Sequence, residues 1–128
     1  MLFLDTCAVI HLADSPHDLP KAAYGALEQT DRIYCSAISA LEIGLLVRNG
    51  RIKIALDVET WFNQCLEHFV ISEIPVSSDI ALLSAKLPLI HRDPFDQIII
   101  ATANRMSLPI VTSDRKFSEY PGTRVIWN

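Results

Sequence analysis

Short apolar runs alternate along this 128-residue chain with stretches in which apolar residues recur every three or four positions. A short continuous apolar run is typical of a strand that is buried on both faces, as in a parallel sheet. The three-and-four spacing is typical of a helix. The runs predict strands at residues 1–4, 32–36, 70–74, 108–113 and 123–127. The helical spacings predict helices at residues 7–13, 19–31, 36–47, 58–69, 77–87 and 94–103, and a short helical turn at 115–120. This alternation predicts an α/β fold with a mostly parallel sheet and helices on both faces.

The stretch at residues 91–103 carries the clearest start signal for a helix. Asp93 precedes Pro94, and aspartate is a favoured cap while proline is a favoured first helical residue. Asp96 then falls in the first turn, where the helix dipole is expected to stabilise a charged carboxylate. Residues 98–101 are apolar all round, which predicts a buried helix. The same isoleucine run is compatible with a strand, and capping alone would explain both acids as well as a functional role would.

Asp5 directly follows the first apolar run and precedes a predicted helix. It could cap that helix, or it could bind a ligand at the end of the strand. We favour the ligand, because the neighbouring Thr6 could equally supply the cap.

Glu42 has two competing interpretations. Together with Ser39 it matches the Ser-x-x-Glu capping box, which is the stronger local signal. Ser36, however, offers an earlier cap directly after the second strand. If the helix begins there, Glu42 lies in the second turn of an otherwise apolar helix, where a buried carboxylate needs a partner.

Composition narrows the class of protein. Half of the residues are apolar, one fifth are charged, and the formal net charge is −4, which together predict one compact domain over residues 1–128. The negative charge argues against broad electrostatic binding to nucleic acid, but not against a nuclease whose acids gather at a metal. No apolar run is long enough for a membrane span, and the N-terminus lacks a signal-peptide pattern. Three cysteines without metal-ligand spacing predict buried free thiols in a reducing cytoplasm.

Four acids are expected at one end of the predicted sheet. Asp5 and Asp114 follow strands, Asp96 opens a helix and Glu42 lies early in another. Ligands of such sheets bind at the carboxyl ends of the strands, where the strand order reverses. Four neighbouring carboxylates repel one another unless protons or a cation neutralise them. An all-oxygen set suits Mg²⁺ or Mn²⁺ rather than zinc, and such ions support hydrolysis of phosphodiester bonds.

Four blocks of the chain resemble PIN-domain ribonucleases, and most of all the VapC-type toxins of bacterial toxin–antitoxin pairs. These blocks are residues 4–6, 36–43, 91–103 and 111–114. The resemblance implies a PIN-like, Rossmann-like fold with a five-stranded parallel sheet. It implies RNA cleavage with Mg²⁺ or Mn²⁺ in the cytoplasm, a homodimer, and inhibition by a cognate antitoxin protein.

The resemblance also assigns residues to the site. Asp5, Glu42, Asp96 and Asp114 match the acidic quartet of the family. Our hypothesis is that Asp5 and Asp96 are the principal metal ligands, and that Glu42 and Asp114 complete the pocket, directly or through waters, and orient the attacking water. Thr6 and Ser113 match positions that often support the quartet through hydrogen bonds. Asp93 is a fifth acid that we assign to capping, with a role beside the metal left open. Cys7 stands where the family often has Asn or Ser.

Two other functions fit the same resemblance. The chain could be a catalytically silent PIN module that binds RNA or protein, or a PIN nuclease of RNA maturation. The complete quartet favours an enzyme over a silent module. The residues that could contact RNA phosphates are Arg48, Arg51, Lys53, Arg115 and Lys116.

Overall fold

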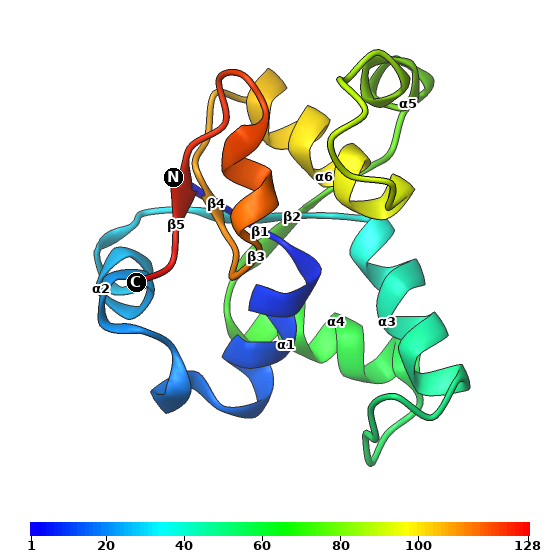
Figure 1. Ribbon diagram of the computed structural model, residues 1–128. Helices are drawn as coiled ribbons and strands as arrows, with labels where there is room; N and C mark the ends of the chain where they lie inside the picture. The colour runs from blue at the N-terminus through cyan, green and yellow to red at the C-terminus, as the bar shows by residue number, and fades with distance from the viewer.

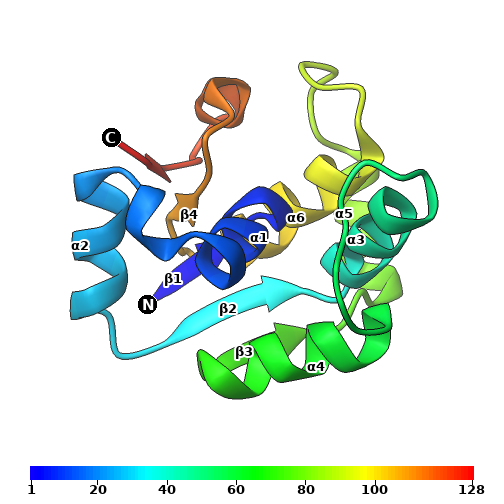
Figure 2. The ribbon, with the colours of Figure 1, turned by 90° about the horizontal axis from the view of Figure 1, so that it is seen from below.

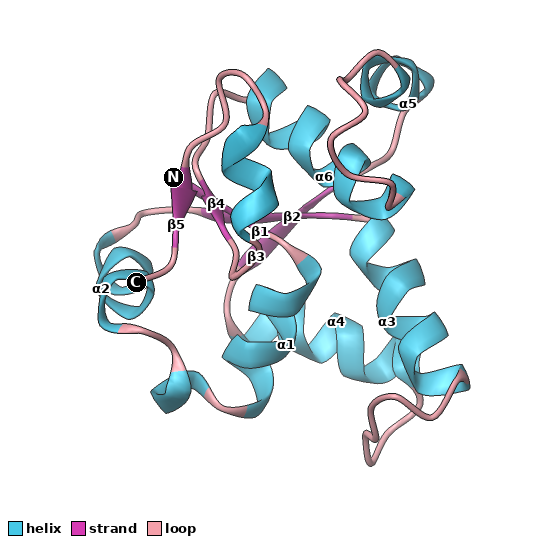
Figure 3. Cartoon of the chain, in the orientation of Figure 1, coloured by secondary structure: helices cyan, strands magenta, loops and turns pink.

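The computed structural model describes residues 1–128, and its strands form a five-stranded sheet in which all neighbours are parallel. The strands are β1 (Leu2–Leu4), β2 (Ile33–Ser36), β3 (Ile71–Ile74), β4 (Ile110–Val111) and β5 (Val125–Ile126). Their order across the sheet is β3-β2-β1-β4-β5 (Figures 1 and 3). The predicted α/β fold with a parallel five-stranded sheet is therefore confirmed.

Every predicted helix is present, with ends that differ by a few residues. The α-helices are α1 (Thr6–Asp14), α2 (Lys21–Gln29), α3 (Ile38–Arg48), α4 (Val58–His68), α5 (Ser78–Ala85) and α6 (Pro94–Arg105). Two short 3₁₀ helices, η1 (Pro16–Asp18) and η2 (Arg115–Glu119), complete the set. None of the helices combines the length and the apolar character that crossing a lipid bilayer requires.

The side chains of β1 alternate between two separate cores. Leu2 and Leu4 pack in a cluster with residues of α1, α2, α3 and α4, whereas Phe3 packs in a second cluster with residues of α6 and η2. Figure 1 shows α6 on one side of the sheet and α1 and α4 on the other, and Figure 2 shows the molecule from below. Because both faces of β1 are covered, a continuous apolar run is the sequence that this strand requires.

The start of α6 follows the local signals in the sequence. Asp93 is the N-cap, and its Oδ1 accepts a hydrogen bond from the Phe95 N–H at 2.9 Å. Pro94 is the first helical residue, and Ile99 and Ile100 are fully buried. The helix, rather than the strand that three isoleucines would also allow, is therefore the correct interpretation.

The last two strands are shorter than predicted. β4 begins only at Ile110, because Pro109 has no N–H and the Leu108 N–H donates back to the Ala103 carbonyl at 2.9 Å. After β4, the Thr112 N–H still donates to the Ile126 carbonyl of β5 at 3.2 Å. Pairing therefore continues for one residue towards Asp114.

Val70 occupies a backbone conformation that a β-branched residue rarely adopts. It follows the C-cap of α4 with a φ of 53°, and its side chain is 80% exposed. Glycine is the usual residue at this position of a helix end. Val70→Gly is therefore expected to raise the free energy of unfolding by about 1 kcal/mol, since relief of a left-handed conformation outweighs the added flexibility of the unfolded chain.

Urea unfolding followed by circular dichroism measures this effect. The matched control is Ala81→Gly at an exposed, ordinary helical position of α5, where the substitution should cost about 1 kcal/mol. A loss of stability in both variants would show that the Val70 backbone is not strained.

Candidate active site

The candidate site lies where the order of the strands reverses. β1 has β2 on one side and β4 on the other, so the chain leaves β1 in one direction and later returns on its opposite side. Asp5 follows β1, and its N–H donates to the Val111 carbonyl at the end of β4 at 3.2 Å. Asp114 lies three residues beyond β4. Both acids therefore lie at the carboxyl ends of the strands, where parallel α/β folds bind ligands.

Asp5 is both a helix cap and a member of the acid cluster. Its Oδ1 accepts a hydrogen bond from the Ala8 N–H at 2.7 Å and so caps α1. Its Oδ2 accepts a hydrogen bond from the Thr112 hydroxyl. Thr6 does not supply the cap, as it is the first helical residue and its Oγ1 lies 2.9 Å from Ser39 Oγ. The expectation that Thr6 could free Asp5 from capping is therefore wrong, although capping and ligand binding do not exclude each other.

Burial raises the pKa of Asp5 to about 6. The hydrogen bonds from Thr112 and Ala8 act in the opposite direction, and the charges of Glu42 and Asp114 raise the pKa further. Only 5% of Asp5 is exposed to solvent. The carboxylate is thus held in one orientation at a place where its negative charge is unfavourable without a compensating cation.

Glu42 lies in the second turn of α3, and the capping-box prediction is wrong. The helix begins at Ile38, so Ser39 is already inside it. Ser36 provides the hydroxyl at this end, since its Oγ accepts a hydrogen bond from the Ile38 N–H at 3.1 Å. Oε1 of Glu42 is buried and has no hydrogen-bond partner. Burial raises the pKa of Glu42, the hydrogen bond with the Thr6 hydroxyl lowers it by less, and the charge of Asp93 raises it slightly further.

Asp96 is the third residue of α6, and burial raises its pKa to about 8. The nearby charges of Asp93, Glu42, Asp5 and Asp114, in that order, raise it further. The expectation that the helix dipole would favour the charged form is therefore wrong. A dipole contributes about 1 kcal/mol or less at most helix ends, and desolvation together with four acids outweighs it.

Asp114 caps η2 and is held on both carboxylate oxygens. Oδ1 accepts a hydrogen bond from the Lys116 N–H at 2.9 Å, and Oδ2 lies 2.9 Å from Nε2 of His91. Its own N–H donates to Thr112 Oγ1 at 3.0 Å. The Thr112 hydroxyl therefore connects Asp5 with the backbone of Asp114. The sequence assigned a supporting role to Ser113, whose Oγ instead lies 3.8 Å from Cys7 Sγ.

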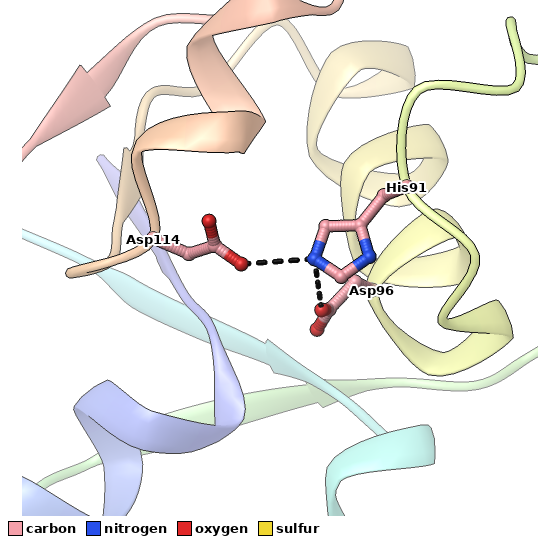
Figure 4. Close-up of side chains that lie close together, drawn as sticks. All are labelled: His91, Asp96 and Asp114. Carbon is pink, nitrogen blue, oxygen red and sulfur yellow. Dashed lines mark hydrogen bonds and ion pairs between the residues drawn. The ribbon is translucent and has the colours of Figure 1, made fainter.

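His91 is a site residue that the sequence pattern did not single out. Its Nε2 lies 2.9 Å from Asp114 Oδ2 and 3.1 Å from Asp96 Oδ2, so one imidazole nitrogen faces two of the four acids (Figure 4). The signal that could have identified it is its position in the 91–103 stretch, two residues before the capping aspartate.

The acids fit a divalent cation. Two sets of side chains bring ligand atoms within 4.8 Å of one another: Glu42, Asp93 and Asp96 form one, and His91, Asp96 and Asp114 form the other. The unpartnered buried oxygen of Glu42 is costly unless a donor or cation satisfies it. A set dominated by carboxylate oxygens suits a hard cation. Asp5 belongs to neither set, although its charge acts on Asp96.

Open space and positive charge adjoin Asp114. A hollow of about 430 Å³ is lined by Asp114, Arg115 and hydroxyl residues, and by Trp127. The largest hollow, about 490 Å³, lies elsewhere, against Trp61 and Phe69 of the α4 region. Arg115 and Lys116 open η2 directly after Asp114, whereas Arg48, Arg51 and Lys53 lie at the end of α3 and in the loop after it. The first pair is thus the better placed to contact a substrate at the acids.

The cysteines are free, but they are not all buried. Cys35 and Cys65 are buried, as predicted, whereas Cys7 is exposed. Cys7 lies in the first turn of α1, and its Sγ is 4.0 Å from His11 Nδ1. The prediction of three buried thiols is therefore wrong for Cys7, since its position on α1 turns it away from the core.

Comparisons with known proteins give a consistent result. The model of the PIN domain family matches residues 2–122. Ribonuclease VapC22 of Mycobacterium tuberculosis is 30% identical over an alignment of 129 positions that covers 98% of each chain. The structure of VapBC2 from Rickettsia felis bound to a DNA fragment from their promoter matches with a TM-score of 0.71, at 19% identity over 100% of both chains. A toxin–antitoxin complex from Klebsiella pneumoniae matches with a TM-score of 0.65, at 24% identity over 96% of this chain and 95% of that one.

Proposed function

This chain belongs to the PIN domain family, and from that premise we infer that it is an endoribonuclease that acts as the toxin of a toxin–antitoxin pair. The resemblance noted in the sequence to PIN-domain ribonucleases is thereby confirmed at the level of the family. The proposed reaction is hydrolysis of RNA phosphodiester bonds. It requires either Mg²⁺ or Mn²⁺.

The observation that carries this proposal is the set of acids at the strand switch point. Asp5 and Asp114 approach it from the ends of β1 and β4, Glu42 from α3 and Asp96 from α6. Burial and mutual repulsion raise the pKa of Asp96 to about 8 and that of Asp5 to about 6. A protein that keeps such acids together without a cation sacrifices stability, which supports a functional site over incidental capping.

The four acids divide into two pairs by their partners. Both carboxylate oxygens of Asp5 and of Asp114 accept hydrogen bonds or face His91, so these two groups are fixed in orientation. Glu42 keeps a buried oxygen without a partner, and Asp96 contacts only His91 among the hydrogen-bonding side chains. We assign all four acids to the cation site. Asp5 and Asp114 are the members whose orientation is already fixed, and Glu42 and Asp96 are the members whose missing contacts a cation or an attacking water would satisfy.

A divalent ion held by these acids would supply charge to activate water and to stabilise the phosphate during in-line displacement. Without it, the Asp96 carboxyl, with its pKa of about 8, carries a proton through most of the neutral range. Binding of a cation at this site would therefore release protons. We assign contacts with RNA phosphates to Arg115 and Lys116, because they are the basic residues that directly follow Asp114 at the start of η2.

The proposed partners are RNA, an antitoxin protein and a second copy of the chain. The Klebsiella relative is a toxin–antitoxin complex, which supports an antitoxin here. Large exposed apolar side chains support a homodimer: Leu41 is 50%, Leu82 62% and Leu89 94% exposed. Contact with a second copy would remove this apolar surface from water. The proposed location is the cytoplasm, where the free cysteines would remain reduced.

Induced expression in a bacterial host tests this function. The wild-type protein is expected to arrest growth and to leave new, discrete ends in total RNA. Asp96→Asn should relieve the arrest and remove these ends, because it deletes the charge shared by both ligand sets. RNA end sequencing after induction makes the comparison.

Purified protein provides the control for this experiment. Asn at position 96 is nearly isosteric with Asp, so both proteins should have the same circular dichroism spectrum. Arrest and RNA cleavage that persisted in Asp96→Asn would exclude this site as the source of activity. A soluble, metal-binding wild-type protein that cleaved no RNA would favour the silent PIN module.

A further inference from the structure

His91 is held rigidly, although it lies in a segment without regular secondary structure. Its N–H donates to the Tyr120 hydroxyl at 2.8 Å, and its carbonyl accepts a hydrogen bond from Gln97 Nε2 at 2.6 Å. Its ring meets Phe117 edge-on, with centroids 6.3 Å apart. Tyr120 and Phe117 are almost fully buried in the second core. Through its backbone and its ring, His91 is thus held between α6 on one side and η2 with the turn after it on the other.

The contacts of the ring determine where its proton lies. Nδ1 of His91 faces the Asp93 N–H at 3.3 Å, so Nδ1 is the hydrogen-bond acceptor. A neutral imidazole has one acceptor and one donor nitrogen, so the proton lies on Nε2, which faces oxygens of Asp96 and Asp114 that can accept its hydrogen bond. A ring with this tautomer donates towards both acids, and Nε2 has no lone pair with which to bind a metal.

We propose that His91 is a positioning residue of the acid site, whose Nε2–H sets the spacing between Asp96 and Asp114 and so prepares them to bind a divalent cation. The inference rests on the proposed metal-dependent function and extends it to a residue outside the acidic quartet. Asp96 lies in α6 and Asp114 caps η2, and His91 contacts both carboxylates through one atom (Figure 4). Partners that orient the ligands of a metal commonly change its affinity by about 10–100-fold when they are lost.

The same geometry has an opposite interpretation. A nitrogen between two carboxylates also occupies space that a bridging cation would need, so His91 could compete with the metal rather than prepare its site. The two interpretations predict opposite changes in metal affinity when the nitrogens are removed. His91→Phe makes this change, because it keeps a ring against Phe117 and deletes both nitrogens.

Mn²⁺ binding to the purified full-length protein separates the two. Isothermal titration calorimetry without RNA, at one fixed pH, measures the Kd of Mn²⁺ for each variant. We expect His91→Phe to weaken Mn²⁺ binding by about tenfold or more, and His91→Gln, which restores an N–H donor of similar reach, to recover most of it. Tyr120→Phe, which removes the hydroxyl that anchors the His91 backbone, should give a smaller loss in the same direction. If His91→Phe does not fold, the Kd of Tyr120→Phe decides between the two interpretations.

The matched control is His68→Phe at the exposed end of α4, outside both ligand sets, and its Kd should equal that of the wild type. An unchanged or lower Kd in folded His91→Phe would overturn the positioning role. A loss that His91→Gln did not recover would also overturn it, because the donor would not be the cause. A wild-type protein that bound no Mn²⁺ at all would instead overturn the proposed metal-dependent function, together with this role.

Discussion

Asp5→Asn should lower the rate of RNA cleavage by more than about a hundredfold and leave the protein folded, since even the outer partners of metal ligands contribute about 10–100-fold. The contacts of Asp5 allow this substitution to remove the charge without removing the hydrogen bonds of the side chain. Asn retains an oxygen that accepts from the Ala8 N–H, and its amide can donate to Thr112 Oγ1 in place of the present contact. The α1 cap and the link to Thr112 are thereby kept, and only the negative charge is lost.

Single-turnover cleavage of an RNA substrate with Mn²⁺ measures the loss of rate, and thermal unfolding shows whether the variant is folded. Asp57→Asn is the matched control, because Asp57 caps α4 in the same way, with its carboxylate accepting from the Thr60 N–H at 2.9 Å. It is exposed and lies outside the acid set, so cleavage should be unchanged.

Asp5→Ala offers a further comparison at the same position. It should be as inactive as Asp5→Asn but less stable by about 1 kcal/mol, because it also loses the helix cap. Full activity in Asp5→Asn would remove Asp5 from the site.

The metal-free protein should lose at least about 3 kcal/mol of stability between pH 4 and pH 8, because one pKa unit corresponds to about 1.4 kcal/mol and the raised pKa of Asp5 alone accounts for that loss. The raised pKa values of Asp96, about 8, and Asp5, about 6, are the cause. Between pH 4 and these values the folded protein holds protons that the unfolded chain has released. Stability therefore falls as the pH rises through 6 and then through 8. The two contributions are not additive, because a proton on one acid relieves the other.

Urea unfolding in the presence of a chelator, at several values of pH, measures this slope. Asp96→Asn should flatten it and should make the metal-free protein more stable than the wild type at pH 8. Mg²⁺ or Mn²⁺ at a hundred times its Kd should restore about 2.7 kcal/mol to the wild type. A stability that rose from pH 4 to pH 8 in the chelated protein would contradict the raised pKa values.

Most signals that act between near neighbours in the chain predict the structure correctly. The Asp93-Pro94 start of α6 needs only the caps and the fixed φ of proline, and the structure has both. The apolar run that became β1 predicted a strand covered on two faces, as found. The arrangement of the four acids at the carboxyl ends of the strands followed from the same local assignments, because parallel strands all have their carboxyl ends on the same side of the sheet.

The remaining signals fail for two reasons, because neighbouring caps compete or because distant segments decide the outcome. The Ser39–Glu42 capping box was a valid local pattern, but the helix starts earlier, at Ile38, where Ser36 supplies the hydroxyl. The dipole of α6 favours a charged Asp96, but burial and charges from four other acids dominate. Thr112 and Ser113 are equally able to donate a hydrogen bond, and only the direction in which each side chain leaves the end of β4 decides that Thr112 meets Asp5.

Local signals are therefore enough to predict the α/β order of elements, the helix that begins after Asp93, and the four acids at the carboxyl ends of the strands. These features depend on periodicity, caps and residue type, which operate over a few residues. The protonation of those acids, the unpartnered oxygen of Glu42 and the place of His91 between Asp96 and Asp114 depend instead on how the chain packs in three dimensions. Burial of a side chain, and contacts between residues that lie far apart in the sequence, exist only in the folded chain. His91 and Asp114, for example, are 23 residues apart in the sequence.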